Sequence, residues 1–253
     1  MSDRAEHRVL ILSYHHVGRP PPGFERRNLW VTPDLLALHV RLVRRLGYKL
    51  TTVSTALAAA SGRFACVTFD DGFADVVRLG YPALDALRVP ATLYVVTDEV
   101  GRRAVVFAED DGTSPSDIAS WDDLRTLATV GWEIGSHCST HRRLARLRPE
   151  EQRMLLERSR DAIAHEIGLA PRALAYPYGS FSAATAAAAR DLGFESAVTT
   201  RRGIALSGID RLRLPRLTMG GHRALHAARV AKILLMHARA EVAPGGRVRA
   251  RSP

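Results

Sequence analysis

Residues 64–72 have the sequence FACVTFDDG, a short and mostly apolar run that stops at two acids and a glycine. Such a run, bounded by turn residues, predicts a β-strand from Phe64 to Phe69. Asp70 and Asp71 then stand where the strand ends. In a parallel α/β barrel, reactive groups collect on the loops that leave the carboxyl ends of the strands. The two acids are therefore candidate catalytic residues if the rest of the chain builds such a barrel.

On both sides of this stretch, short apolar strands alternate with amphipathic helices. One helix begins at Thr32, a capping residue followed by Pro33 and Asp34, and ends at Gly47. The predicted strands are Val9 to Ser13, Phe64 to Phe69, Ala91 to Val96, Trp132 to Ile134, Ala173 to Tyr176, Glu195 to Thr199 and Arg213 to Leu217. The further predicted helices are Ala74 to Leu87, Trp121 to Val130, Glu150 to Ile167, Ala183 to Leu192 and Ala224 to Ala240. Repeated strand–helix units favour a parallel sheet, and this many units favour a closed barrel. An open doubly wound sheet is the alternative, although no G-x-G-x-x-G follows the first strand.

The composition is that of a folded globular protein with a basic excess. The chain has 253 residues, 46% of them hydrophobic, and 36 Lys and Arg against 26 Asp and Glu give a net charge of +10. Aromatic residues make up only 6% and do not alternate with the arginine clusters, so we expect no nucleic-acid partner. No apolar run approaches the roughly 18 residues of a membrane span, and the first eight residues mix charges of both signs. These features predict a cytoplasmic protein without a transmembrane segment.

Three segments lie outside the strand–helix pattern. Residues 1–8 are expected to be an N-terminal extension, and residues 242–253, rich in Arg, Gly and Pro, a disordered basic tail. A single domain is expected from residue 9 to residue 241. Within it, residues 102–116 are expected to form a long surface loop near the active face.

A second group of polar residues follows the predicted strand at Trp132 to Ile134. His137 and His141 are four positions apart, a spacing that would place both imidazoles on one face if the segment made a helical turn. One carboxylate and two imidazoles would form a three-ligand set for a divalent metal that leaves positions open for water. Such open coordination is typical of a catalytic metal site.

Five short motifs occur in order, each at a predicted strand end. TFDDG (68–72), HCSTH (137–141) and AYPYG (175–179) resemble the motifs of the polysaccharide deacetylases with a NodB-homology domain. SYHHV (13–17) and RLPR (213–216) are similar to the subgroup that acts on poly-N-acetylglucosamine and related exopolysaccharides. The resemblance runs from about residue 9 to residue 219. It implies an α/β fold, a distorted (β/α) barrel with seven parallel strands.

The resemblance also implies a role for individual residues. It makes Asp71, His137 and His141 the ligands of a divalent metal, zinc being preferred over cobalt, nickel or iron. Asp70 becomes the general base that takes a proton from the attacking water. The backbone N–H of Tyr178 would help to hold the tetrahedral oxyanion. The substrate-binding residues that it implies are Pro177, Tyr178 and Gly179.

The chain departs from the family pattern at two positions. Many members have an arginine where this chain has Ala175, and that arginine steadies the catalytic aspartate; we assign this role to Arg216. The late L-x-H motif that supplies the general acid is matched only by LMH (235–237), in the predicted terminal helix. His15, at the end of the first strand, is the better placed candidate for the acid or for a substrate contact. His16 is expected to be a buried histidine with satisfied hydrogen bonds.

The function that follows is a metal-dependent hydrolase that removes N-acetyl groups from an amino sugar in a poly- or oligosaccharide. One alternative is a deacylase of a small cytosolic or lipid-linked sugar, or of another amide. Another is a catalytically silent barrel that only binds glycans. The substrate, an N-acetylated saccharide, is the one partner that the sequence predicts; it does not predict the oligomeric state.

Overall fold

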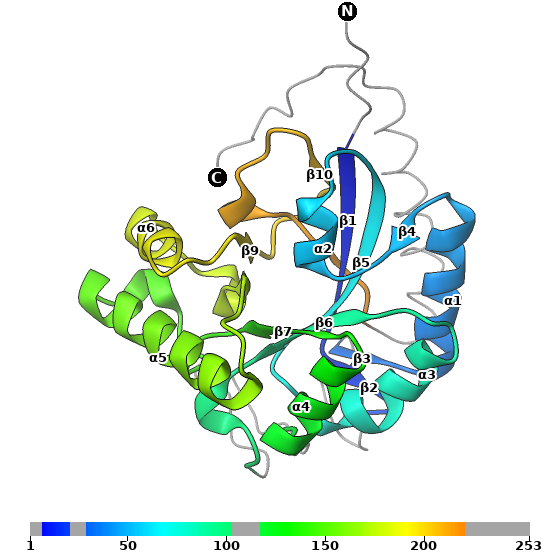
Figure 1. Ribbon diagram of the computed structural model, residues 1–253, viewed down its shortest axis with the longest axis horizontal. Coiled ribbons are helices and arrows are strands. Elements are labelled where there is room, and N and C mark those ends of the chain that lie inside the picture. The colour runs from blue at the N-terminus through cyan, green and yellow to red at the C-terminus, as the bar shows by residue number, and fades with distance from the viewer. Residues whose placement is uncertain (1–6, 21–28, 103–116, 221–253) are drawn as a thin grey trace, which may run out of the picture.

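Parallel strands form a strongly curved sheet at the centre of the protein (Figure 1). The computed structural model describes residues 7–20, 29–102 and 117–220. The main parallel strands are β1 (His7–Tyr14), β5 (Gly62–Phe69), β6 (Ala91–Val95), β7 (Glu133–Ser136), β8 (Ala173–Ala175) and β9 (Ser196–Val198). Each pairs with the next in this order. Parallel neighbours require crossover connections, and helices supply most of them.

The chain after β9 closes the sheet into a distorted barrel. Leu214 forms a parallel bridge with Val198 of β9, and β11 (Leu217–Thr218) pairs in parallel with the end of β1. With this closing segment added to the six strands above, seven parallel strands surround the interior. The α/β barrel predicted from the sequence is therefore confirmed. The start of β1 pairs instead with β10 (Ala205–Leu206), which is antiparallel.

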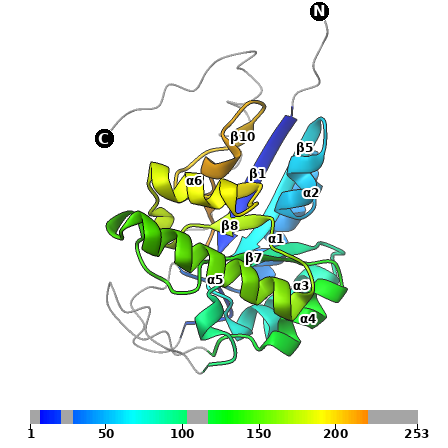
Figure 2. The same cartoon turned by 60° about the vertical axis from the view of Figure 1, so that its left-hand side comes forward.

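Helices cover the outside of the barrel (Figures 1 and 2). They are α1 (Pro33–Arg45), α2 (Val53–Ala58), α3 (Tyr81–Asp85), α4 (Trp121–Thr129), α5 (Pro149–Ile167) and α6 (Ala183–Asp191). In Figure 1, α1 and α3 lie on the opposite side of the sheet from α5 and α6. The expected capping residue Thr32 accepts a hydrogen bond from Leu35 N at the start of α1. Gly168, with φ +78°, ends α5 in the left-handed conformation that suits glycine.

Alternate residues of β1 pack into different parts of the core. Leu10 and Leu12 belong to the large cluster that also contains the buried residues of α1 and α4. Val9 and Ile11 belong to a second cluster that joins β1 to Tyr94 and to residues of β8 and β9. Because successive side chains of a strand point to opposite faces, the first cluster lies between sheet and helices and the second fills the barrel.

Two predicted elements differ from the structure. The helix expected over Ala74 to Leu87 is a π-helical stretch, Val76–Gly80, followed by α3. Pro82 explains the wider turn, because proline offers no N–H and its ring crowds the carbonyl four residues earlier. The strand expected over Arg213 to Leu217 is also interrupted: Arg211–Arg213 is a 3-10 turn, and only Leu214 and β11 pair with other strands.

The short elements that the sequence did not predict lie mostly at the barrel ends. They are β2 (His16–Val17), β3 (Trp30–Val31), β4 (Lys49–Leu50), α2, β10, and the 3-10 turns Thr97–Glu99, Leu144–Arg146 and Pro177–Gly179. Several predicted segments lie outside the described residues. They are residues 1–6 of the expected extension (1–8), most of the 102–116 loop, the terminal helix over 224–240, the LMH triplet and the basic tail. Residues 7 and 8 of the expected extension belong to β1. None of the helices described here is long and apolar enough to cross a membrane.

Candidate metal centre and active site

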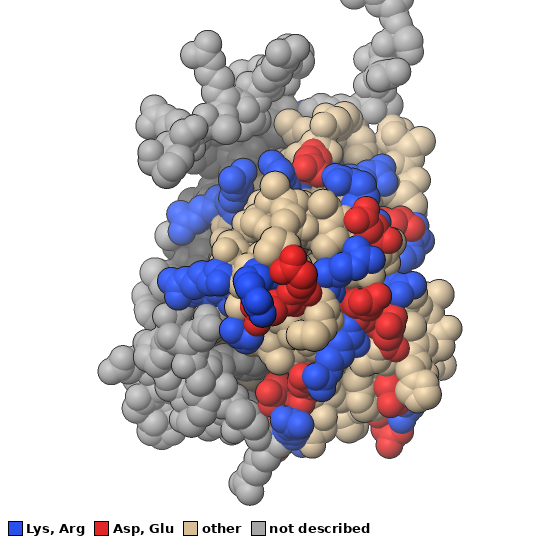
Figure 3. Space-filling model, turned by 90° about the vertical axis from the view of Figure 1, so that its left-hand side faces the viewer, with Lys and Arg blue, Asp and Glu red and all other residues tan. Residues whose placement is uncertain are grey.

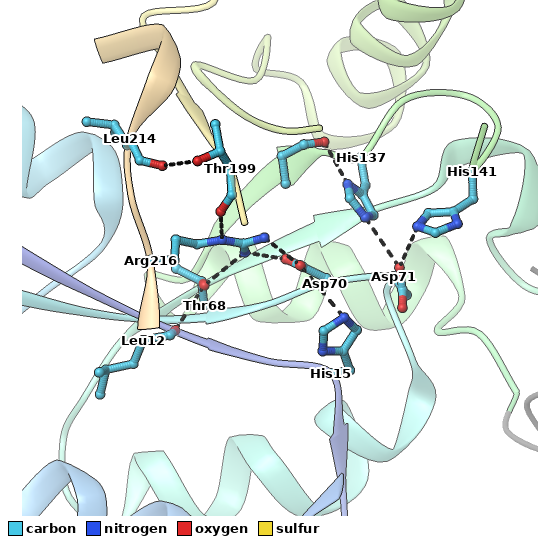
Figure 4. Close-up of polar contacts among 11 residues, drawn as sticks. Leu12, His15, Thr68, Asp70, Asp71, His137, His141, Thr199, Leu214 and Arg216 are labelled. Carbon is cyan, nitrogen blue, oxygen red and sulfur yellow. Dashed lines mark hydrogen bonds and ion pairs between the residues drawn. The ribbon is translucent and has the colours of Figure 1, made fainter. Parts of the chain in front are cut away.

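The predicted site residues lie at the carboxyl-terminal ends of the strands, where the sequence placed them (Figure 4). His15 follows β1, Asp70 and Asp71 follow β5, and His137 follows β7. His141 is four residues farther along the same loop. Because parallel strands end at one rim of the barrel, these side chains meet although they are far apart in the sequence.

Asp71, His137 and His141 form one compact cluster. Oδ1 of Asp71 lies 3.4 Å from Nε2 of His137 and 3.5 Å from Nε2 of His141. One potential ligand atom from each of the three residues lies within 4.8 Å of the others. Two ligands about 2.1 Å from a tetrahedral metal ion are about 3.4 Å apart, so the two measured separations fit zinc-like coordination.

The chemistry of the donor atoms also fits a cation. Oδ1 of Asp71 is buried and accepts no hydrogen bond within the part of the chain that the structure describes. Nδ1 of His137 donates a hydrogen bond to the carbonyl of Ala175 at 2.6 Å, which leaves the lone pair of Nε2 facing Asp71 when the ring is neutral. A buried carboxylate beside ring nitrogens that present lone pairs could hold a divalent metal.

Burial and charge set the protonation of these groups. Burial opposes ionisation of Asp71, but interactions with His137 and His141 outweigh it and hold the pKa of Asp71 well below its usual range. Burial lowers the pKa of His141 to about 4, so this ring is neutral near pH 7. For His137 burial acts in the same direction, but the neighbouring Asp71 and Asp70 raise its pKa above the ordinary value.

The two histidines meet through a bend in the loop and not through a helical turn. Residues 137–141 contain no helix, and Cys138 adopts φ +66°. This left-handed residue bends the loop, and its small side chain is fully buried. Both imidazoles thus face the same carboxylate without the helical turn on which the expectation of a common face depended.

Asp70 and Asp71 point in different directions because Asp71 itself is left-handed, with φ +73°. Asp70 faces Arg216, whose Nη1 and Nη2 donate hydrogen bonds to its two carboxylate oxygens at 2.7 and 2.8 Å. Burial would raise the pKa of Asp70, but the charge and hydrogen bonds of Arg216 hold it below the ordinary value. Asp70 is thus ionised and fixed in orientation.

Arg216 is held in turn by two residues to which the sequence assigned no role. Its Nε donates to the carbonyl of Thr199 at 3.1 Å, and Nη1 approaches Oγ1 of Thr68 at 3.5 Å. Thr68 is part of the TFDDG motif, but its hydroxyl also bonds the carbonyl of Leu12, a contact that only the folded sheet reveals. No pattern in the sequence could have identified Thr199.

His15 and His16 lie on different sides of the chain. Nε2 of His15 is 3.9 Å from Oδ2 of Asp70, and burial lowers the pKa of His15. His16 is fully buried between the rings of Trp30 and Phe73, and its Nδ1 donates to Asp75 at 2.7 Å. His15 therefore faces the site, while His16 has the buried, hydrogen-bonded position expected of it.

The turn Pro177–Gly179 lies beside the cluster. Tyr178 has φ +59°, and its ring centroid is 4.4 Å from that of His141. The guanidinium of Arg143 stacks over the same tyrosine ring at 4.1 Å, a contact that the sequence did not predict. Gly179 has φ +65°, and a Cβ at this position would lie 2.8 Å from the backbone nitrogen of Thr200. The turn thus requires glycine for both its conformation and its packing.

Comparisons with known proteins agree with this geometry. A family model described as polysaccharide deacetylase matches residues 58–197, more than half of the chain. The Bacillus subtilis (strain 168) protein YxkH, whose name assigns it to the polysaccharide deacetylases, is 24% identical over 204 residues. The aligned part covers 78% of this chain and 66% of YxkH, just under two thirds of that relative.

Two solved structures illustrate the shared fold. The Streptococcus pyogenes deacetylase PplD in complex with acetate superposes with a TM-score of 0.76 at 22% identity, over 92% of this chain and 99% of PplD. IcaB from Ammonifex degensii gives a TM-score of 0.72 at 22% identity, over 90% of this chain and 97% of IcaB. The structural similarity shows that the fold is shared. Because the family model matches more than half of the chain, the chain belongs to the polysaccharide deacetylase family.

Proposed function

We propose that the protein is a metal-dependent hydrolase that removes N-acetyl groups from an amino sugar in a poly- or oligosaccharide. The observation that carries this proposal is the convergence of Asp71, His137 and His141 beside the Asp70–Arg216 pair. Family membership supports deacetylation of a carbohydrate. The metal requirement and the amide substrate are inferred from the donor atoms and their surroundings.

Asp71, His137 and His141 would hold the cation. A divalent metal bound by them would supply Lewis acidity, which lowers the pKa of water and polarises a carbonyl oxygen. The protein prepares this site in advance: the Ala175 carbonyl fixes the ring of His137, and burial keeps His141 neutral. Zinc matches the nitrogen and oxygen donors best, and cobalt, nickel and iron are compatible with them.

Asp70 and His15 would carry one proton through the reaction. Ionised Asp70, oriented by Arg216, accepts the proton of the water that attacks the amide carbonyl. His15 is neutral in the resting protein because burial lowers its pKa. His15 lies 3.9 Å from Asp70, and in this proposal it would take that proton and pass it to the nitrogen as the carbon–nitrogen bond breaks. The products are acetate and a free amine.

The turn at Tyr178 would stabilise the negative oxygen that forms during the attack. Tyr178 is held in a left-handed conformation with its ring 4.4 Å from that of His141, and in this proposal its backbone N–H would point to the reacting carbonyl. A backbone N–H directed at a developing oxyanion often lowers the activation barrier by about 3 kcal/mol.

A screen for acetate release tests the proposal. The zinc-loaded protein would be incubated with N-acetylglucosamine, its β-linked oligomers and N-acetylated polymers. We expect acetate and an equal amount of free amine from at least the oligomers. Tight oligosaccharide binding without acetate, with the metal present, would show a glycan-binding barrel instead, and acetate from monomeric conjugates alone would favour a small-molecule deacylase.

A further inference from the structure

A groove of about 420 Å³ opens beside the proposed active site. It lies between the loop that follows Pro177–Gly179 and the chain that follows β9. Two lining residues connect it to the site. Gly179 directly follows Tyr178, and Thr199 accepts the hydrogen bond of the Arg216 guanidinium that orients Asp70. The groove therefore adjoins the proposed active site.

One wall of the groove is aromatic. Phe181 lines the groove, is only partly buried, and stacks on Tyr176 with the ring centroids 4.7 Å apart. Tyr176 is fully buried and its hydroxyl donates to the carbonyl of Leu212, so the Phe181 ring has a rigid support. With Tyr176 stacked on the ring and the Arg213 guanidinium over it, Phe181 forms a firm apolar wall, and such walls line most ligand sites.

The charged side chains that line the groove are both arginines, Arg201 and Arg213. Arg213 lies 5.7 Å from the Phe181 ring, and its Nε is 3.2 Å from a carboxylate oxygen of Asp210. Arg201 is exposed and makes no ion pair with a carboxylate of the described residues. The groove therefore keeps a positive charge. Figure 3 shows the side of the molecule that carries α5 and α6, where basic side chains project with few acidic ones beside them on the left.

The backbone of Arg201 is fixed relative to the catalytic residues. Its N–H donates to Oγ1 of Thr199 at 3.2 Å, and its carbonyl accepts a hydrogen bond from the backbone of Arg216 at 2.7 Å. One hydrogen bond thus joins the Arg201 backbone to Arg216, and the other joins it to Thr199, whose carbonyl accepts from the Arg216 guanidinium. The backbone from which the Arg201 side chain extends is therefore fixed next to the residue that orients Asp70.

From this juxtaposition we infer that the groove is a subsite for an acidic sugar unit, one that carries a carboxylate or a phosphate, next to the N-acetylated unit that is cleaved. The guanidinium groups of Arg201 and Arg213 bind the anionic group, and Phe181 forms the apolar wall beside them. Guanidinium groups match the oxygens of carboxylates and phosphates in geometry as well as in charge. The inference rests on the proposed deacetylation and names its substrate class.

The same charges disfavour a homopolymer of amino sugars. Each deacetylation leaves an amine that is protonated near neutral pH, and a product strand with several such groups would meet Arg201 and Arg213. Like charges brought close together in a groove repel. A glycan in which acidic units alternate with N-acetylated ones avoids this repulsion.

Three tetrasaccharides with the same number of N-acetylglucosamine units test the subsite. One is neutral, one has glucuronate as the alternate unit, and one carries 6-phosphate groups. The ratio of kcat/KM for each acidic tetrasaccharide to that for the neutral one is measured for the zinc-loaded wild type, for Arg201→Gln and for Arg41→Gln. Arg41 is an exposed arginine on α1, on the opposite side of the sheet from α6, so its substitution removes the same charge elsewhere.

We expect the wild type to favour one acidic tetrasaccharide by about tenfold, Arg201→Gln to lose that preference and Arg41→Gln to retain it. The favoured member distinguishes carboxylate from phosphate. A kcat/KM ratio near one in the wild type, or an equal loss of the preference in both variants, would overturn the subsite. A variant that folds poorly lowers all rates without changing the ratio. If no tetrasaccharide releases acetate, the proposed function fails, and calorimetric measurement of tetrasaccharide binding then tests the subsite separately. Weaker binding of the acidic tetrasaccharide by Arg201→Gln alone would support the subsite. Equal binding by all three proteins would refute the subsite.

Discussion

Arg216 and Asp70 are 146 residues apart in the sequence, yet the guanidinium of one donates two hydrogen bonds to the carboxylate of the other, at 2.7 and 2.8 Å. Both side chains are buried. Arg216 belongs to the segment that closes the barrel, and Asp70 ends β5. This ion pair therefore joins the closure of the fold to the orientation of the proposed general base.

Arg216→Gln is expected to lower the free energy of unfolding by about 3–5 kcal/mol, because it leaves the carboxylate of Asp70 buried without a counter-charge. Arg172→Gln is the matched control. Arg172 makes a similar two-bond contact with Glu195, but on the surface, where loss of the pair costs about 1 kcal/mol or less. Urea denaturation of the metal-free proteins measures both values. Equal losses for the two variants would show that the buried pair has no special role in stability.

Asp70→Asn is expected to retain metal and to lose turnover. The amide cannot accept a proton from water, and general base catalysis typically contributes a factor of about 10²–10⁴ in rate. Metal content by mass spectrometry and acetate release on the same samples separate the two effects. A variant that turned over at the wild-type rate would remove Asp70 from the mechanism.

His137→Ala is expected to weaken metal binding strongly, since it removes one of three donors and the ring that the Ala175 carbonyl orients. His165→Ala, at an exposed histidine of α5, should bind metal as the wild type does. Competition with a fluorescent zinc chelator gives both dissociation constants. Unchanged affinity in His137→Ala would place the metal elsewhere.

His15→Ala is expected to reduce kcat while the affinity for metal remains unchanged. His15 is 3.9 Å from Asp70 and is not part of the three-residue cluster, so its loss affects proton transfer alone. A reduction of about 10²-fold or more would fit a general acid. If KM rises and kcat stays constant, His15 contacts the substrate instead.

Gly179→Ala is expected to reduce both stability and kcat/KM. A residue with a side chain pays about 1–2 kcal/mol for the left-handed conformation, and here its Cβ would also meet the backbone of Thr200. Gly208→Ala is the control, since φ there is +81° and nothing lies within 4 Å of the added atom. The difference between the two variants in unfolding free energy measures the clash, and kcat/KM should fall only for Gly179→Ala.

The sequence predicted the barrel because its strands are short apolar runs that end in polar residues, such as Phe64 to Phe69 before Asp70. It also placed the candidate site residues at one rim, since parallel strands must end together. The closing segment was predicted only in part. Its pairing is interrupted at Pro215, and Leu214 forms only a single bridge, to Val198. A strand of this kind has no continuous apolar pattern in the sequence.

The parts of the site that could not be predicted depend on backbone geometry and long-range contacts. The residue types at Cys138 and Asp71 do not indicate a left-handed backbone, because neither residue is glycine. The contacts of Thr199 with Arg216 and of Arg143 with Tyr178 join distant segments by side chains that are common on any surface. Only the folded chain reveals such pairs.

The most direct test of the proposed chemistry is a zinc titration of the metal-free protein with acetate release recorded at every step on an N-acetylglucosamine oligomer. We predict that activity is absent without metal, rises in proportion to bound zinc and reaches its maximum at one ion per chain. Full activity in the presence of a strong chelator, or one bound zinc per chain without any acetate released, would contradict the account.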